Sequence, residues 1–133
     1  MYLLDTNICI YAMKNKYPAV LQKLLLVPPQ EIYLSSITVG ELEYGASKSR
    51  WSEKNRHAFT AFLSAFSVLP FTYHDAIRFG RLRAQLALKG TPIGYYDVMI
   101  AAQGIERNLT VVTHNTKEFQ RVEGITLEDW VLA

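Results

Sequence analysis

Three carboxylates that lie far apart in the sequence, Asp5, Glu41 and Asp97, have the chemistry of ligands for one divalent cation. Each also has an ordinary structural explanation, because acids near a helix start cap free N–H groups and interact favourably with the helix dipole. Clustered together without a cation, the three would repel one another and raise one another's pKa. Mg²⁺ prefers oxygen ligands and keeps several waters, so two or three carboxylates suffice to bind it. We therefore predict a Mg²⁺ site, with Mn²⁺ as the alternative ion.

A carboxylate-bound Mg²⁺ ion suits hydrolysis of a phosphodiester. It can hold the phosphate, activate a water as the nucleophile and stabilise the leaving oxygen. A zinc site is not indicated, because the three histidines, His57, His74 and His114, lack ligand spacing and Cys9 is the only cysteine.

Short apolar runs alternate with longer segments of helical periodicity along the chain. The patterns predict strands at 2–4, 32–35, 67–69, 110–113 and 125–127, helices at 7–14, 18–26, 38–48, 51–65, 73–89 and 95–108, and a helical turn at 117–119. Strands that are joined by helical crossovers form parallel sheets with helices on both faces. The predicted fold is α/β, a three-layer α/β/α sandwich around a mainly parallel, twisted sheet.

The strand ends indicate where a site would form. In open parallel sheets, ligands bind beyond the carboxyl ends of the strands. Asp5 directly follows the first predicted strand, and Thr113 and Asn115 lie at the end of the fourth. Thr38, after the second strand, has the spacing of a helix N-cap whose capping box is completed by Glu41.

Length and composition favour one globular domain, residues 1–133, of which half are apolar. The formal net charge is only +2, although the segment 48–89 holds eight Lys and Arg against two acids and could steer a polyanion. No basic leader and no apolar run of membrane-spanning length is visible, and a lone cysteine suits a reducing compartment. We expect a cytoplasmic protein with no membrane contact.

Four motifs appear in order along the chain. They are LDTN at 4–7, SSITVGEL at 35–42, GTPIGYYDVMIAA at 90–102 and THNTKEF at 113–119. Together they resemble the VapC toxins, which are PIN-domain ribonucleases of bacterial toxin–antitoxin pairs. The resemblance covers essentially the whole chain and implies a PIN-like domain.

The resemblance assigns roles to individual residues. It implies that Asp5 and Asp97 are the principal Mg²⁺ ligands and that Glu41 is a further acidic ligand, direct or through water. Asn115 falls where the family carries Asp or Asn and would close the acidic pocket as a neutral group that orients water or phosphate. Orienting groups for the carboxylates would be Thr6, Asn7 and Thr113.

The resemblance also implies a biological role. Such a protein is the toxin of a type II pair, a Mg²⁺-dependent endoribonuclease that is inhibited by a VapB-like antitoxin. The most similar members cut initiator tRNA in the anticodon stem-loop, so tRNA is the expected substrate. Family members also form homodimers, and these join into larger complexes with antitoxin and, through the antitoxin, with operator DNA.

Two alternatives remain open from the sequence. One is a catalytically idle domain of the same fold that only binds RNA or antitoxin, although an idle domain would be free to lose its acids. The other is a phosphatase of the haloacid-dehalogenase type. Its nucleophilic Asp is normally followed two residues later by a second Asp, and here that place is Asn7.

Overall fold

The computed structural model describes residues 1–132. Its strands are β1 (Tyr2–Leu4), β2 (Ile32–Ser35), β3 (Ser67–Leu69), β4 (Thr110–Val112) and β5 (Leu127–Glu128). Its helices are α1 (Thr6–Lys14), α2 (Pro18–Leu26), α3 (Ser36–Lys48), α4 (Ser52–Leu63), α5 (Tyr73–Leu88), α6 (Tyr95–Glu106) and α7 (Thr116–Phe119), with a 3₁₀ turn at Pro29–Glu31. Each predicted element is present, with ends that differ by a few residues.

The five strands form one sheet in the order β3-β2-β1-β4-β5, and every neighbouring pair is parallel. In this register Leu4 of the central strand lies beside Leu34 of β2 and Val112 of β4. The carboxyl ends of these three strands therefore reach the same edge of the sheet. The predicted α/β class with a parallel sheet is confirmed.

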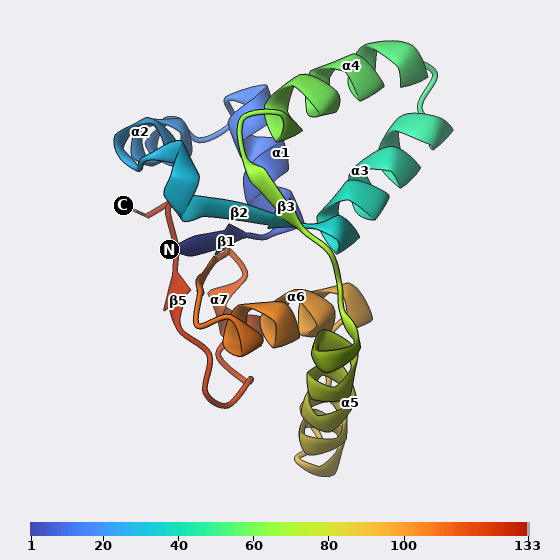
Figure 1. The fold of residues 1–133 in the computed structure, drawn as a ribbon, viewed down its shortest axis with the longest axis vertical. Helices are drawn as coiled ribbons and strands as arrows, with labels where there is room; N and C mark the ends of the chain where they lie inside the picture. The colour runs from blue at the N-terminus through green and yellow to red at the C-terminus, as the bar shows by residue number, and fades with distance from the viewer. Residues whose placement is uncertain (133) are drawn as a thin grey trace.

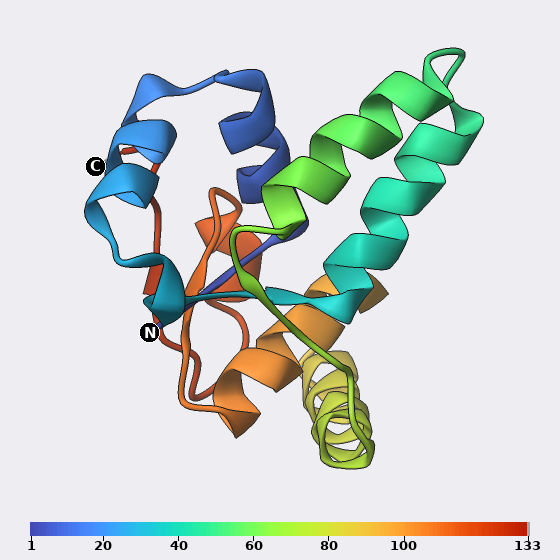
Figure 2. The same cartoon turned by 45° about the horizontal axis from the view of Figure 1, so that its top comes forward.

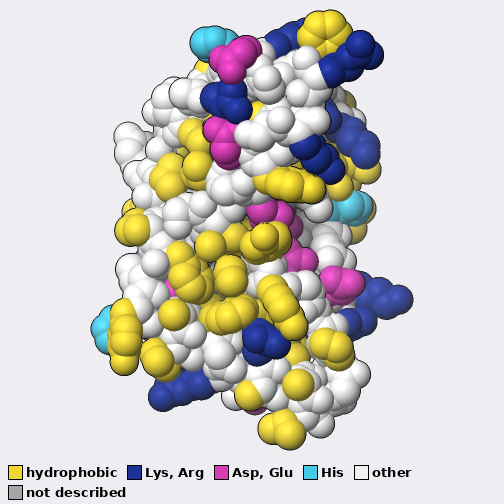
Figure 3. Space-filling model, turned by 90° about the vertical axis from the view of Figure 1, so that its right-hand side faces the viewer, with side chains coloured by type: hydrophobic (Ala, Val, Ile, Leu, Met, Phe, Trp, Pro, Cys, Tyr) yellow, Lys and Arg dark blue, Asp and Glu magenta, His cyan; other side chains and the backbone are white. Residues whose placement is uncertain are grey.

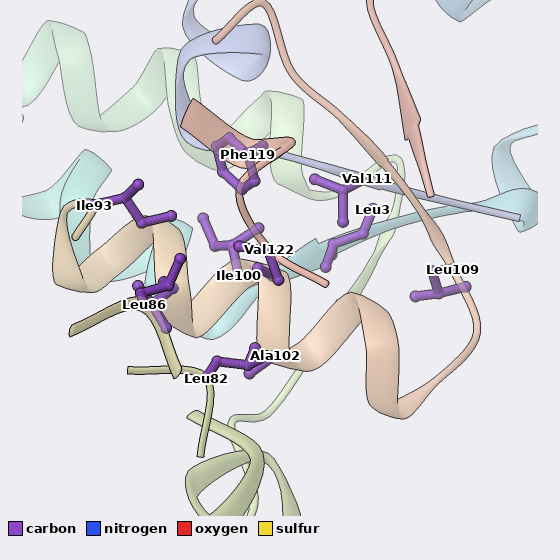
Figure 4. Close-up of a cluster of buried hydrophobic side chains, with 12 residues drawn as sticks. Leu3, Leu82, Leu86, Ile93, Ile100, Ala102, Leu109, Val111, Phe119 and Val122 are labelled. Carbon is purple, nitrogen blue, oxygen red and sulfur yellow. The ribbon is translucent and has the colours of Figure 1, made fainter. Parts of the chain in front are cut away.

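Helices cover both faces of the sheet, with α1 to α4 on one side and α5 to α7 on the other (Figures 1 and 2). The strands supply both cores because successive side chains point to opposite faces. Leu3 and Val111 pack with α5, α6 and α7 in the cluster drawn in Figure 4, whereas Leu4 and Val112 pack under α1 and α2. Gly104 lets α6 approach the sheet, because a Cβ there would lie 2.5 Å from Val111 Cγ2.

The start of α3 differs from the prediction. Ser35, not Thr38, is the N-cap, and its hydroxyl accepts a hydrogen bond from the Ile37 N–H at 3.0 Å. The helix thus begins directly at the end of β2, Thr38 lies buried within it, and Glu41 is in its second turn. The predicted capping box of Thr38 and Glu41 is therefore wrong. Ser35, Ser36 and Thr38 all carry a hydroxyl that can cap a helix, and only the observed end of β2 selects among them.

One further difference is smaller. The last strand is Leu127–Glu128 and not 125–127, because it pairs with Val111 and Val112 of β4.

Among residues 1–132, no helix combines the length and the apolar character needed to cross a membrane.

Candidate active site

Asp5 lies at the carboxyl end of the central strand and is 4% exposed. It is also the N-cap of α1, since its Oδ1 accepts a hydrogen bond from the Ile8 N–H at 2.9 Å. Burial raises its pKa to about 6; hydrogen bonds from Thr113 and Ile8 work against this rise, and the charges of Asp97 and Glu41 add to it. The cap and the acidic cluster thus use the same side chain.

Asp97 reaches the site from the first turn of α6, on the opposite face of the sheet from α1. It is half-buried, and its pKa is raised to about 6 by burial first and then by the charges of Glu41 and Glu118. The mutual influence of Asp5, Asp97 and Glu41 shows that the structure brings the three predicted acids into one neighbourhood.

Glu118 is an acid of this neighbourhood that the sequence reading did not single out. It lies on the short helix α7, and its Oε2 accepts a hydrogen bond from Asn115 Nδ2 at 2.9 Å. The signal was its place in the fourth motif, three residues after Asn115. Asn115 itself is exposed and contacts the acidic cluster through Glu118.

A chain of hydroxyl groups fixes Glu41. Thr6 Oγ1 donates to Glu41 Oε1 at 2.7 Å and lies 3.0 Å from Thr38 Oγ1. A threonine hydroxyl has one hydrogen to donate, so when Glu41 is ionised the Thr38 hydroxyl must donate to Thr6. Both threonines are buried, so water does not compete for the hydrogen bond between their hydroxyl groups. The residue next to Asp5 therefore orients a carboxylate that comes from another helix.

We expect Thr6→Val to raise the Mg²⁺ concentration that RNA cleavage requires, because Glu41 is no longer oriented, without unfolding the protein. Valine matches the shape of threonine but leaves Glu41 without its donor. Loss of such an orienting group costs roughly 10- to 100-fold in metal affinity or activity. The check is the Mg²⁺ concentration for half-maximal RNA cleavage, which should rise in Thr6→Val and return to near the original value in Thr6→Ser. An equal effect of both variants would contradict the positioning role.

The donor chemistry fits a hard divalent cation. Asp5, Glu41 and Asp97 offer only oxygen, and no Lys or Arg forms an ion pair with any of them within the described part of the chain. The cluster is looser than a closed cage, because among residues 1–132 no three acidic, His or Cys side chains are close enough together to ligate one ion. Mg²⁺ is commonly bound by one or two carboxylates plus waters and phosphate oxygens.

Three other polar side chains, His114, Asn7 and Glu43, are not among the groups that influence the pKa of Asp5 and Asp97. His114 Nδ1 lies 2.9 Å from Asp129 Oδ2, which ties the end of β4 to the C-terminal segment. Asn7 is exposed on α1. Glu43 faces away from the site and pairs with Arg56 on α4 at 2.8 Å.

The basic segment 48–89 does not form a single patch. Three of its eight cations are in ion pairs, namely Arg56, Arg78 and Lys89. Other cations of the segment lie over aromatic rings, and two of these, Lys48 and Arg50, are close to the α3–α4 turn.

Comparisons with known proteins define the class. Residues 2–125 match the PIN domain family. The chain is 45% identical to the tRNA(fMet)-specific endonuclease VapC of Salmonella typhimurium, covering 97% of each protein, and 42% identical to ribonuclease VapC2 of Rickettsia felis, covering 98% of each. The crystal structure of DNA-bound VapBC from Salmonella typhimurium matches the fold with a TM-score of 0.91 at 45% identity, over 97% of both chains.

The chain belongs to the PIN domain family and, within it, to the VapC ribonucleases. This confirms the resemblance, the PIN-like fold and the enzyme class that the four motifs implied. The phosphatase alternative is thereby excluded.

Proposed function

We propose that this chain is the toxin of a type II toxin–antitoxin pair, an endoribonuclease whose divalent cation, Mg²⁺ or alternatively Mn²⁺, is held by Asp5 and Asp97 with help from Glu41. The observation that carries the proposal is the pair of carboxylates at the sheet edge, each with its pKa raised to about 6. Clustered acids of this kind are unfavourable unless a cation or a proton balances them. A bound divalent ion would neutralise the scissile phosphate and make a water more acidic.

The protein side chains supply orientation. The Ile8 N–H and the Thr113 hydroxyl fix Asp5, and the Thr6 hydroxyl fixes one oxygen of Glu41. The second oxygen of Glu41 is then available to orient the attacking water. Water adds its oxygen to phosphorus, the bond from phosphorus to the 3′ oxygen breaks, and that oxygen takes up a proton. The products carry a 5′-phosphate and a 3′-hydroxyl.

The substrate we propose is initiator tRNA, cut in its anticodon stem-loop in the cytoplasm. Support comes from two relatives, of Salmonella typhimurium at 45% identity and of Shigella flexneri at 43%, that are named tRNA(fMet)-specific endonucleases. Both align over 97% of this chain.

The partner we propose is a VapB-like antitoxin. Relatives from Salmonella typhimurium and Rickettsia felis have been crystallised as VapBC complexes with DNA. A mostly apolar groove of about 280 Å³ lies between α1, α3 and α4, with Ile10, Met13 and Phe59 among its lining residues and Glu41 at its border. A segment docked there would reach the acids, which explains how one partner both binds and inhibits. We also propose a toxin homodimer, joined by antitoxins into larger complexes on operator DNA.

Mapping RNA 5′ ends after brief expression tests the function. Wild-type protein should produce new 5′-phosphorylated ends in the anticodon stem-loop of initiator tRNA, and Asp97→Asn should produce none. Co-expression of the antitoxin should suppress the ends. New ends scattered over other RNAs would reject the tRNA assignment but retain the ribonuclease. Identical RNA profiles from wild type and Asp97→Asn would support the idle binding module instead.

A further inference from the structure

An open groove of about 710 Å³ lies on the other side of α3 from the apolar groove. It is lined by Ser36, Ile37, Gly40, Glu41, Tyr44 and Tyr96. Its volume is in the range of about 300–1,000 Å³ that is usual for ligand sites. Figure 3 shows Asp and Glu side chains near the middle of one face, bordered by hydrophobic groups, with Lys and Arg side chains both above and below them. Because Glu41 belongs both to the groove and to the acidic cluster, a ligand there lies beside the reacting phosphate.

Two tyrosines from different helices border the groove. Tyr44 of α3 is 66% exposed and Tyr96 of α6 is 58% exposed. Both residues are exposed and not part of the buried core, so their rings are accessible to a ligand. Proteins that bind single-stranded RNA stack unpaired bases on such rings. The pair therefore has the chemistry of a base-binding site.

Two cations follow Tyr44 in the sequence, at the end of α3 and in the turn after it. The Lys48 Nζ lies 5.0 Å from the centre of the Tyr44 ring, one turn further along the helix. Arg50 lies over the Trp51 ring at 5.7 Å, in the turn between α3 and α4. Glu41 in the groove and Lys48 beside Tyr44 match a strand whose cleaved phosphate lies at the acids and whose next phosphate approaches Lys48.

Gly40 keeps the groove open. It is exposed, and a Cβ built on it would meet no atom within 4 Å. A larger residue at this position would fill the groove without disturbing the packing of α3. Glycine costs a helix interior roughly 1 kcal/mol relative to alanine, so the residue is not there for helix stability.

We propose that this groove binds an unpaired nucleotide next to the scissile phosphate, with its base stacked on Tyr96 or Tyr44 and an adjoining phosphate held by Lys48. The inference rests on the proposed ribonuclease function and adds the residues that position the RNA. It also assigns the two sides of α3 to different ligands, RNA to the groove with Gly40 and antitoxin to the groove with Phe59.

The first test measures stacking separately from catalysis. A short single-stranded RNA carrying 2-aminopurine beside the cut site is titrated with the inactive Asp97→Asn protein, and its fluorescence should be quenched on binding. Adding Tyr96→Ala or Tyr44→Ala should weaken binding by about 10-fold for the ring that stacks, and Tyr→Phe at the same position should stay within about twofold. In otherwise wild-type protein the same alanine variant should raise KM much more than it lowers kcat.

The second test blocks the groove. Gly40→Gln should weaken RNA binding and cleavage by about 10-fold or more, in line with the loss of one stacked base. Gly80→Gln on α5 is the matched control, because Gly80 is also an exposed helical glycine whose Cβ would meet nothing within 4 Å. It should gain the same helix propensity and leave cleavage unchanged.

The outcomes separate the two proposals. Absence of cleavage by the wild-type protein would overturn the ribonuclease proposal itself. Normal cleavage by wild type together with unchanged KM and quenching in Gly40→Gln and in both Tyr→Ala variants would overturn only the nucleotide site. If Gly40→Gln instead abolished self-association or antitoxin binding while RNA binding stayed normal, the groove would be a protein interface and the inference would be wrong.

Discussion

Asp5→Asn is expected to abolish RNA cleavage and, at the same time, to make the metal-free protein more stable at pH 7. The loss of activity should exceed about 100-fold, the upper end of what removal of a mere orienting group costs at a metal site. The gain in stability follows from burial: at pH 7 the folded protein keeps a carboxylate ionised in a place that raises its pKa from 3.8 to about 6. By linkage this corresponds to roughly 3 kcal/mol.

Asparagine removes the unfavourable charge but keeps the helix cap. Its side-chain oxygen can accept the Ile8 N–H as Asp5 does, and Asn and Asp are about equally good N-caps. Urea unfolding in EDTA at pH 7 should therefore show an increase of up to about 3 kcal/mol in the free energy of unfolding. Addition of Mg²⁺ should stabilise the wild type and have much less effect on Asp5→Asn.

Asp75→Asn is the control with the opposite sign. Asp75 is fully buried; burial alone would raise its pKa, but its ion pair with Arg107 and hydrogen bonds from Thr72 lower the pKa below the ordinary value. Its charge therefore stabilises the fold, and the variant should lose roughly 3 kcal/mol, as other broken buried pairs do. If Asp5→Asn were destabilised to the same extent as Asp75→Asn, Asp5 would be a structural acid and not a metal ligand kept at a cost in stability.

The contrast between Asp5 and Asp75 shows how much of the site the sequence could reveal. Asp5 was predictable because it follows an apolar run, and in a parallel sheet the strand end fixes its position. The sequence gives no reason to predict a functional role for Asp75. In the structure it forms a capping box with Thr72 and an ion pair with Arg107, so its role is structural.

What the sequence could not supply depends on contacts between elements. The hydroxyl chain from Thr38 through Thr6 to Glu41 joins α1 and α3, and no spacing within either helix encodes it. Glu118 reaches the acids only because the short helix α7 follows the end of β4. The groove between Tyr44 and Tyr96 likewise exists only once α3 and α6 lie side by side.

Cleavage is expected to fall steeply as the pH drops below 6. Asp5 and Asp97 both have a pKa raised to about 6, so at pH 5 each is roughly one-tenth ionised and both together roughly one-hundredth. Metal binding needs the carboxylate forms. We therefore expect kcat/KM at fixed Mg²⁺ to be level above about pH 7 and roughly 100-fold lower at pH 5.

The stability of the metal-free fold should change in the opposite direction over this range. An acid whose pKa is raised by folding contributes stability when protonated, fully below its unfolded pKa near 4, and this contribution is lost as the pH rises through about 6. Acidification from pH 7 to pH 5 should thus raise the melting temperature in EDTA while it lowers activity. Glu43 does not contribute here, because Arg56 holds its pKa at about 2.

Magnesium titration identifies which groups are responsible. If Asp5 and Asp97 are the ligands, protons and Mg²⁺ compete for the same oxygens, and a tenfold increase in Mg²⁺ should move the midpoint of the activity profile to lower pH. A titration elsewhere in the protein would leave that midpoint fixed. Loss of activity that coincides with unfolding would also reject the assignment, because these two acids make the metal-free fold more stable, not less, when they are protonated.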